Sequence, residues 1–361
     1  MTREADLLGR RLLNQKLARS RLRKPADVVA WLGAVQAQDY AGAKWGVGQR
    51  ANGVTDADVD RACDEGAILR THVMRPTWHF VAPADIRWLL ALTAPRVHAA
   101  TGSSNRKLGL DSRTFQRSER ALERALRGGG YMTRPELKAV LRRVGIATDV
   151  QRLAHLMLHA ELEQVVCSGP RRGKQFTYAL FDERVPKART WKREDALAEL
   201  ARRYFASHGP ATLRDYAWWS GLTVGDARAG IAAVKPALAH EVIEGRGYWR
   251  APSRVTPLPA EPVAHLLPNY DEYLIAYKDR DPVVGPQGSR NRVARPEDAF
   301  AHLLVIEGLL AGTWRRSVIG SVVVVDVTPY RRLPRRSLDA VAAAAESYGS
   351  FLETEVRLSI S

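Results

Sequence analysis

The sequence predicts an α+β fold in which a two-helix and hairpin unit occurs three times before a different C-terminal region begins. Three observations predict it. Each unit opens with a short helical segment that begins at a capping residue or near a proline. A second helical segment follows and begins at a threonine, a common N-cap. A run typical of a β-hairpin then ends the unit. This order is that of a winged helix-turn-helix, and three copies in series are a stronger signal than one.

The first unit is expected within residues 1–100, with helices in KPADVVAWLGAVQ and TDADVDRACDEGA and a hairpin in ILRTHVMRPTWHFVAP. The second, within residues 101–190, contains MTRPELKAVLRRVG, TDVQRLAHLMLHAELE and the hairpin QVVCSGPRRGKQFTYALF. The third, within residues 191–256, contains ATLRDYAWWSGLT, TVGDARAGIAAVK and LAHEVIEGRGYWR. The expected turns are marked by Arg75-Pro76, by the Gly- and Pro-containing residues 168–173 and by Gly245-Arg246-Gly247.

Residues 257–361 change pattern and predict an antiparallel β unit with a helix. The run SVVVVDV is typical of a buried strand, and SLDAVAAAAESYGSFLE predicts the final helix. Before these lies YKDRDPVVGPQGSRNRVARPEDAF, which is too long for a tight turn and is typical of a functional or disordered loop. Its arginines, Arg290 and Arg292, are candidates for entering a DNA groove.

Composition indicates a globular protein, because 45% of residues are hydrophobic and 26% are charged. No apolar run reaches the roughly 20 residues that span a membrane, and the N-terminus lacks an apolar signal core. We therefore expect a cytoplasmic, nucleoid-associated protein. The two cysteines, Cys63 and Cys167, exclude a disulfide framework. His155 and His159 have the spacing of a zincin helix, but Leu156 stands where the catalytic glutamate belongs. Neither a metal nor a cofactor is expected.

The net charge of +16 indicates a polyanionic partner such as DNA, RNA or an acidic membrane surface. A general arginine bias is the alternative, but it would scatter the charge. One segment arranges it on a single helical stripe with spacings of 4, 3, 4 and 3: Arg113, Arg117, Arg120, Arg124 and Arg127. Phosphate contact and a plain surface helix both remain open for this stripe. The same holds for Arg171 and Arg172 in the second hairpin turn, which are either phosphate contacts or ordinary turn residues.

The stretch VQAQDY, residues 35–40, places two glutamines one residue apart where a helix is expected to end. On a helix, residues 36 and 38 lie about 200° apart and cannot face one site. Both can serve one site only if the helix ends near Gln36, and the following Asp39-Tyr40-Ala41-Gly42 favours such a break. From spacing alone, the preferred interpretation is a polar helix end whose amides bind free backbone carbonyls.

The stretches WLGAVQAQDYAGAKWGVGQR, ILRTHVMRPTWHFVAPADIRWLL and LLPNYDEYLIAYKDR resemble the AlkZ/YcaQ superfamily of winged-helix DNA glycosylases. The resemblance covers most of the chain. The family signature is Gln, a small or apolar residue, then Gln or Asp, and Gln36-Ala37-Gln38 resembles its AlkZ branch. The resemblance implies tandem winged helices around a concave basic DNA channel that contains both glutamines. It also implies excision of bulky alkylated purines and unhooking of interstrand crosslinks made by DNA-alkylating natural products.

Amide side chains suit such a reaction. An N7-alkylated guanine already carries positive charge and leaves without an acid, while the sugar becomes oxocarbenium-like. The amide oxygens of Gln36 and Gln38 can stabilise that charge and hold the attacking water. Asp39 is the rival as a general base, although a turn or N-cap aspartate is the preferred interpretation. Asp271 and Glu272 are a second possible acidic element, or form a structural salt link to Arg280.

Lys44, Arg75 and His79 flank the motif or lie on the first hairpin and are candidate phosphate or lesion contacts. The sequence thus predicts a monofunctional DNA glycosylase that acts as a monomer on double-stranded DNA carrying alkylated bases. A non-catalytic winged-helix regulator and an RNA-binding module are the alternatives, and a regulator is expected to dimerise. Self-resistance to one natural product and general repair both remain open.

Overall fold

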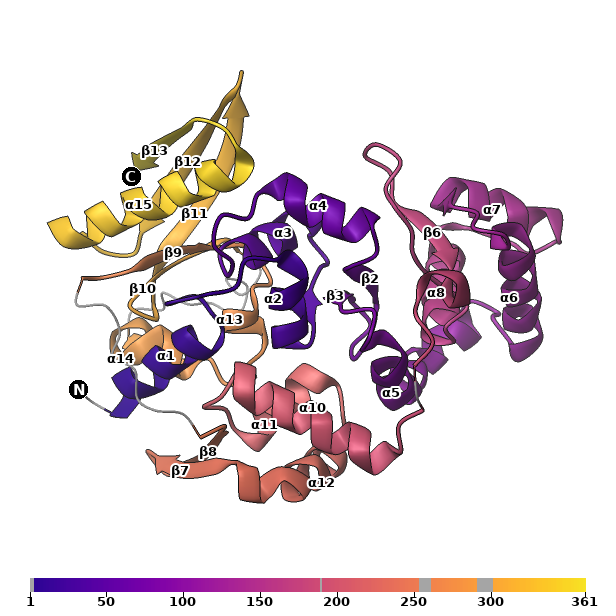
Figure 1. Ribbon diagram of the computed structural model, residues 1–361, viewed down its shortest axis with the longest axis horizontal. Coiled ribbons are helices and arrows are strands. Elements are labelled where there is room, and N and C mark those ends of the chain that lie inside the picture. The colour runs from indigo at the N-terminus through magenta and orange to yellow at the C-terminus, as the bar shows by residue number, and fades with distance from the viewer. Residues whose placement is uncertain (1–2, 189, 253–260, 291–300) are drawn as a thin grey trace.

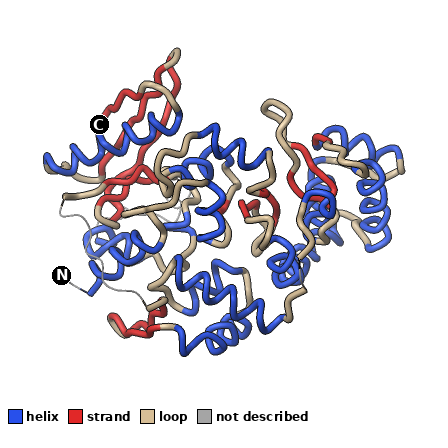
Figure 2. The backbone as a smooth tube through the Cα atoms, viewed as in Figure 1, coloured by secondary structure: helices blue, strands red, loops and turns tan. Residues whose placement is uncertain are grey.

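The computed structural model describes residues 3–188, 190–252, 261–290 and 301–361, in a mixed arrangement of helices and strands (Figure 1). Figure 2 shows that the strands form one extended group beside the C-terminus and small separate groups among the helices. Within the described residues, no helix is both long enough and apolar enough to cross a membrane.

Three stretches of chain, here called the first, second and third repeats, share one order of elements: a helix, a short strand, two helices and a hairpin. The first repeat contains α2 (Pro25–Leu32), β1 (Val35–Gln36), α3 (Tyr40–Gly48), α4 (Asp56–Asp64), β2 (Leu69–His72) and β3 (Trp78–Val81). The second contains α6 (Ser112–Leu126), β4 (Met132–Thr133), α7 (Arg134–Arg143), α8 (Val150–Leu162), β5 (Val166–Ser168) and β6 (Thr177–Leu180). The third contains α10 (Arg193–Ser207), α11 (Leu213–Ser220), α12 (Val224–Val234), β7 (Ala239–Ile243) and β8 (Arg246–Arg250).

The small sheets of the repeats have the same topology. Their orders are β1-β3-β2 and β4-β6-β5, so the short strand always pairs with the second strand of the hairpin. In the third repeat, a single antiparallel bridge between Ala211 and Trp249 of β8 replaces the short strand. Capping boxes begin one helix in each repeat, at Thr55 for α4, Thr133 for α7 and Thr212 for α11.

In the first repeat, the two helices expected from the sequence are not the two that precede the hairpin directly. The segment KPADVVAWLGAVQ forms α2, which corresponds to α6 and α10, the helices that come before the short strand or bridge in the other repeats. The counterpart of α7 and α11 is α3, which the sequence analysis did not identify. Three glycines in α3 weaken its helical signal. They are needed for close packing: a Cβ at Gly48 would lie 2.4 Å from the Phe351 ring, and one at Gly42 would lie 2.9 Å from Asn269 Oδ1.

The C-terminal region forms one sheet of order β13-β12-β11-β10-β9. The expectation of a purely antiparallel unit was wrong at its last strand. β13 pairs with β12 in parallel, because α15 carries the chain back along the sheet before β13 begins. The elements of this region are β9 (Ala264–Leu267), α13 (Glu272–Ile275), α14 (Asp281–Arg290), β10 (Leu303–Ile306), β11 (Leu309–Ile319), β12 (Val322–Pro329), α15 (Arg335–Leu352) and β13 (Val356–Ile360).

The first repeat shares its core with the C-terminal region. Trp45 of α3 packs with Tyr348 and Phe351 of α15, and Phe80 of β3 belongs to the same cluster. The second repeat has a core of its own and lies on the opposite side of the molecule from the C-terminal sheet (Figure 1). The long helix α5 (Ile86–Lys107) runs from the first repeat to the second. The N-terminal helix α1 (Arg3–Asn14) and the short helix α9 (Phe181–Arg184) complete the packing.

Candidate active site around Gln36

Gln36 lies on a strand and not at a helix end. Helix α2 ends at Leu32, because Gly33 adopts a left-handed φ of 82° and the chain then extends into β1. Gln36 pairs with His79 of β3, and the N–H of Ala37 donates to the carbonyl of Trp78 at 2.7 Å. Gln38 follows in a bend, so the two glutamines are not on one helix and the helical spacing that would point them about 200° apart does not apply.

The two glutamines differ in exposure. Gln36 is 6% exposed, and its Oε1 has no hydrogen-bond partner among the described residues. Gln38 is exposed in the bend that follows. Asp39 then caps α3, and its carboxylate accepts the N–H of Gly42 at 3.2 Å. The segment thus places the buried, unpaired amide oxygen of Gln36 two residues before the exposed amide of Gln38, and the capped helix α3 follows at once.

Glu272, at the start of α13, holds the backbone of Gln36. Its Oε1 accepts the N–H of Gln36 at 2.8 Å, and its Oε2 accepts the indole N–H of Trp219 at 3.0 Å and lies 3.6 Å from His208 Nε2. Burial disfavours the anion, but His208, the Gln36 N–H and Arg75 outweigh this and hold the pKa of Glu272 below its ordinary value. A buried carboxylate therefore joins the first repeat, the third repeat and the C-terminal region at the strand that carries Gln36.

The neighbouring Asp271 forms a buried ion pair with Arg50, which follows α3. Two hydrogen bonds join the groups, Nη1 to Oδ2 at 2.8 Å and Nη2 to Oδ1 at 2.7 Å. Arg50 also donates to the carbonyls of Gly46 and Gln15. The expected salt link to Arg280 is replaced by this pair, and Arg280 donates to the carbonyl of Leu274 instead. Asp271 thus supports the position of α3.

His79 and Arg75 lie beside Gln36 with unpaired polar atoms. His79 is fully buried, and its Nδ1 is 2.9 Å from the carbonyl of Thr77, so Nδ1 carries the proton and Nε2 is an acceptor. Burial and the nearby Arg75 lower the pKa of His79 to about 3, so the ring is neutral at pH 7. Burial also lowers the pKa of Arg75, against the influence of Glu272. The guanidinium lies 5.8 Å from the ring centre of Trp218.

Buried polar atoms without partners accumulate here. Within the described part of the chain, no partner is found for Gln36 Oε1, His79 Nε2, Thr77 Oγ1, or Nε and Nη2 of Arg75. Because Gln36 and His79 are directly paired across the strands, their side chains share one side of the sheet. Buried polar groups in proteins are nearly always hydrogen-bonded. This concentration of free donors and acceptors makes the surroundings of Gln36 the candidate site for a polar ligand.

Several basic residues predicted to contact DNA are used inside the protein. Lys44 is buried and pairs with Asp56 at 2.5 Å and Asp60 at 2.9 Å. Arg171 also pairs with Asp60, at 2.5 Å, and Arg172 pairs with Glu136 at 2.8 Å. Lys44 and Arg171 therefore join segments of the protein, whereas Arg172, whose side chain is 55% exposed, pairs with Glu136 at the surface.

The arginine stripe is exposed but peripheral. Its first four members lie on α6 and Arg127 follows the last residue of that helix. The opposite face of α6 carries Phe115, Leu122 and Leu126 into the core of the second repeat. In Figure 1, α8 stands between α6 and the strands of the first repeat. Of the remaining predicted contacts, the side chain of Arg290 and the whole of Arg292 lie outside the described residues.

The sequence analysis missed an exposed apolar hairpin tip. Val318 and Ile319 at the end of β11 are 70% and 66% exposed, and Gly320 forms the turn to β12. Arg315 and Arg316 on the same strand are also exposed. The run RRSVIGS contained the signal, a glycine turn after two β-branched residues, but it was assigned simply as strand.

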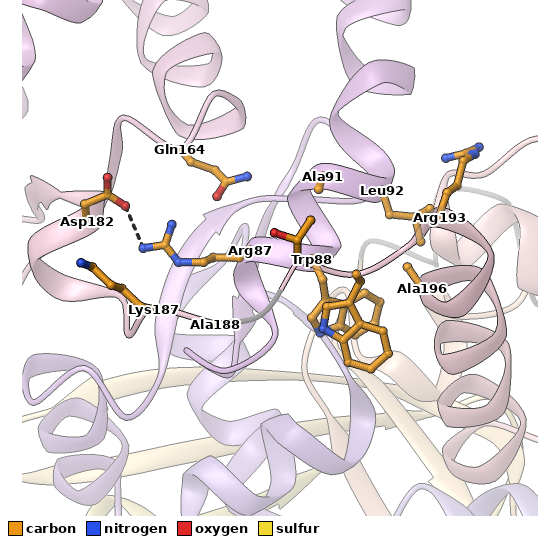
Figure 3. A pocket seen from close by; sticks show the side chains of 12 residues that line it. Arg87, Trp88, Ala91, Leu92, Gln164, Asp182, Lys187, Ala188, Arg193 and Ala196 are labelled. Carbon is orange, nitrogen blue, oxygen red and sulfur yellow. Dashed lines mark hydrogen bonds and ion pairs between the residues drawn. The ribbon is translucent and has the colours of Figure 1, made fainter.

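A separate cavity of about 710 Å³ lies between α5 and the segment before α10 (Figure 3). Trp88, Trp191, Arg193 and Gln164 line it, and Arg87 forms an ion pair with Asp182 at its edge. None of the predicted site residues lines this cavity. The unpaired groups around Gln36, and not the cavity, therefore define the candidate active site.

The chain is similar to known proteins along most of its length. The family model described as DNA glycosylase AlkZ-like matches residues 29–351. The interstrand DNA cross-link repair glycosylase of Streptomyces sahachiroi is 25% identical over 335 residues, which cover 88% of this chain and 89% of that protein. The solved structure of the Streptomyces sahachiroi DNA glycosylase AlkZ is similar with a TM-score of 0.78 and 23% identity, over 99% of both chains. This likeness confirms the mixed α+β fold.

Proposed function

Since the chain belongs to the AlkZ-like DNA glycosylase family, we propose that it excises N7-alkylated guanines from double-stranded DNA by hydrolysis without a catalytic metal. The observation that carries this proposal is the buried, unpaired amide oxygen of Gln36 next to the exposed Gln38. The proposed substrates include interstrand crosslinks attached at N7 of guanine, in keeping with the name of the similar Streptomyces sahachiroi interstrand DNA cross-link repair glycosylase.

The three repeats serve in this proposal as winged helix-turn-helix units around a DNA channel. Their shared order of elements and the addition of the short strand to the hairpin support the assignment. The exposed tip of the β11–β12 hairpin suits insertion into a minor groove, because it combines apolar Val318 and Ile319 with the exposed Arg315. The stripe on α6 is a further candidate phosphate contact at the periphery.

Gln36 and Gln38 act on the sugar as the glycosidic bond breaks. An amide oxygen that is already desolvated and held by its backbone loses little on reorganising toward a developing positive charge. Glu272 provides that hold, since it accepts the N–H of Gln36 from a buried position. A neutral amide gives little help with an uncharged purine, which is a poor leaving group, so the site favours bases that already carry positive charge.

Arg75, His79 and Trp218 contact the displaced base. The free N–H groups of Arg75 match the O6 acceptor of guanine. His79 Nε2 is an acceptor for a base N–H in its neutral form. Trp218 is 42% exposed beside Arg75 and offers a stacking surface for a base outside the helix.

A sequence-reading regulator has less support. The last helix of a helix-turn-helix normally enters the major groove. In the first repeat that helix is α4, whose side chains include Asp56, Asp58, Asp60 and Asp64. Such a helix repels phosphate. In the second repeat, α8 is covered by α6 and α5.

The test is base release. Purified protein is incubated, in the presence of a chelator, with duplex DNA that contains 7-methylguanine, with a crosslinked duplex, and with undamaged duplex. Release of free 7-methylguanine and unhooking of the crosslink are expected, with no release from undamaged DNA. Tight binding of the damaged duplex without release of any base would overturn the glycosylase assignment and favour a non-catalytic DNA-binding protein.

A further inference from the structure

A cluster of two imidazoles and two carboxylates lies where α5, α6 and α8 meet. His98 comes from α5, His159 from the last turn of α8, and Glu163 follows one turn later. One ligand atom from each of these three residues lies within 4.8 Å of the others. Glu119 of α6 adds a fourth group, since its Oε1 is 2.9 Å from His159 Nε2. None of these residues belongs to the site around Gln36.

From this geometry we propose that His98, His159 and Glu163 bind one divalent transition-metal ion of the Zn²⁺ class. His159 and Glu163 are four residues apart in sequence at the end of α8, which is the spacing of a chelating pair. A tetrahedral Zn²⁺ with bonds of 2.0–2.2 Å holds its ligand atoms about 3.4 Å apart. The three ligand atoms already lie within 4.8 Å of one another, and the closest pair, His98 Nε2 and Glu163 Oε1 at 2.7 Å, needs to open by less than about 1 Å to admit the ion.

The chemistry of the cluster suits a dication. Two imidazoles and one carboxylate form a donor set that zinc accepts readily. Glu119, whose Oε1 is 2.9 Å from His159 Nε2, can hold that imidazole in place, as carboxylates beside metal-binding histidines commonly do. Phe115 stacks on the His159 ring at 3.8 Å and fixes its orientation, as groups around a metal ligand commonly do.

The ion has a structural role in this proposal. His98 lies on the helix that leaves the first repeat, whereas Glu119 and His159 belong to the second repeat. One ion would therefore fasten the second repeat to the connecting helix α5. None of its ligands belongs to the site around Gln36, so the ion is placed to hold helices together rather than to take part in base release. The proposal is thus independent of the metal-free glycosylase chemistry.

The structure gives different partners to His155 and His159, the two histidines with the spacing of a zincin helix. His155, one turn before His159 on the same helix, is bound to Asn105 at 2.6 Å and is outside the cluster. The expectation of two ordinary histidines is therefore retained for His155 and replaced by the metal site for His159. His155 consequently offers a matched control.

The experiment uses the tag-free full chain after chelator treatment and dialysis. Zn²⁺ is titrated by calorimetry, and Co²⁺ is titrated by visible absorption, which reports tetrahedral coordination. We expect one ion per chain, weakened by at least about 100-fold in His159→Gln and His98→Ala and unchanged in His155→Ala. Zn²⁺ should raise the Tm of the wild type and of His155→Ala but not of His159→Gln.

Two results would overturn the site. One is the absence of stoichiometric Zn²⁺ binding to the wild type. The other is equal affinity in the wild type and in two cluster variants, His159→Gln and Glu163→Gln, each with a circular dichroism spectrum that confirms folding. The free cysteines, Cys63 and Cys167, are present in every variant, so binding to thiols cancels in the comparison. No readout depends on base release, so the outcome is separate from that of the glycosylase test.

Discussion

The first and second repeats differ at the junction between the short strand and the next helix. In the second repeat, β4 ends at Thr133, and the same residue caps α7 through a capping box with Glu136. In the third, Thr212 caps α11 directly after the bridging Ala211. In the first repeat, Ala37 and Gln38 stand between the end of β1 and the capping Asp39. In the second and third repeats the strand or bridge therefore leads directly into the helix cap, an arrangement here called the closed junction. In the first repeat two extra residues separate them, and this arrangement is called the open junction.

The residues paired with these strands show the same contrast. Opposite Thr133 lies Thr177, whose hydroxyl donates to the carbonyl of Pro170. Opposite Gln36 lies His79, whose Nε2 has no partner among the described residues. An unpaired buried polar group costs roughly 1–3 kcal/mol. The first repeat carries this cost at several atoms around Gln36, which is the difference expected if its junction binds a ligand, as proposed, and the junction of the second repeat serves stability.

The largest expected effect is a loss of stability when the buried ion pair between Asp271 and Arg50, which supports α3 after the open junction, is broken. Asp271→Ala leaves Arg50 buried without a counterion and should lower the free energy of unfolding by about 3–5 kcal/mol. Thr133→Ala, at the closed junction, removes only a helix cap and should cost about 1 kcal/mol. Urea unfolding followed by circular dichroism measures both. Equal losses would mean that the two junctions are held with the same strength, against the comparison.

The next effect concerns catalysis. Gln36→Ala and Gln38→Ala should each slow base release by about 100-fold, or about 3 kcal/mol, because each removes an amide that acts on charge in the transition state. The double variant should be slower than either single variant, but by less than the product, since both amides address the same carbon. Single-turnover release of 7-methylguanine is the measurement, and Thr133→Ala at the closed junction should keep the wild-type rate.

Asp39→Asn distinguishes the amide mechanism from its rival, because asparagine is also a good N-cap and preserves α3. If this substitution abolishes release while both glutamine variants remain active, a carboxylate general base replaces the amides. If all three variants keep full activity, the reacting group lies elsewhere, and Glu272 becomes the first residue to test.

The smallest expected effect is a dependence of stability on pH that comes from His79 at the open junction. The pKa of His79 is lowered to about 3 in the folded protein and is ordinary, about 6.5, in the unfolded chain. The unfolded state therefore binds more protons between these values, so stability falls as the pH drops from about 6.5 toward 3. His79 should contribute about 1.4 kcal/mol per pH unit in that window. Unfolding at pH 7, 6 and 5 should show a shallower slope in His79→Gln than in the wild type. Identical slopes would mean that His79 is protonated when folded.

Local patterns in the sequence predicted much of the fold. The last helix, the buried strand after Ser321 and the hairpins of the repeats follow from periodicity and turn residues that are close in the chain. Helix α3 did not, because its glycines are explained only by Phe351 and Asn269, far along the sequence. The packing of distant segments overrides a weak local helical signal.

The candidate site divides in the same way. The resemblance to the AlkZ/YcaQ superfamily marked Gln36 and Gln38, whereas their spacing alone favoured a polar helix end. The carboxylate that holds Gln36 comes from a residue 236 positions away. Similarly, formal charge suggested that Lys44 and Arg171 were free, whereas the fold places Asp60 between them. Single-sequence patterns show which groups exist and not which groups meet.

Tyr40 connects the β5–β6 hairpin to the loop that carries Gln38. Its ring contacts Phe80 of the first repeat and Phe176 of the β5–β6 hairpin segment, with centroid distances of 5.6 Å and 5.0 Å. Its hydroxyl donates to Asp60, the carboxylate that also binds Arg171 from the hairpin. The loop and the hairpin are therefore joined through Tyr40 and Asp60, so a displacement of the hairpin is expected to move the loop that carries Gln38 as well.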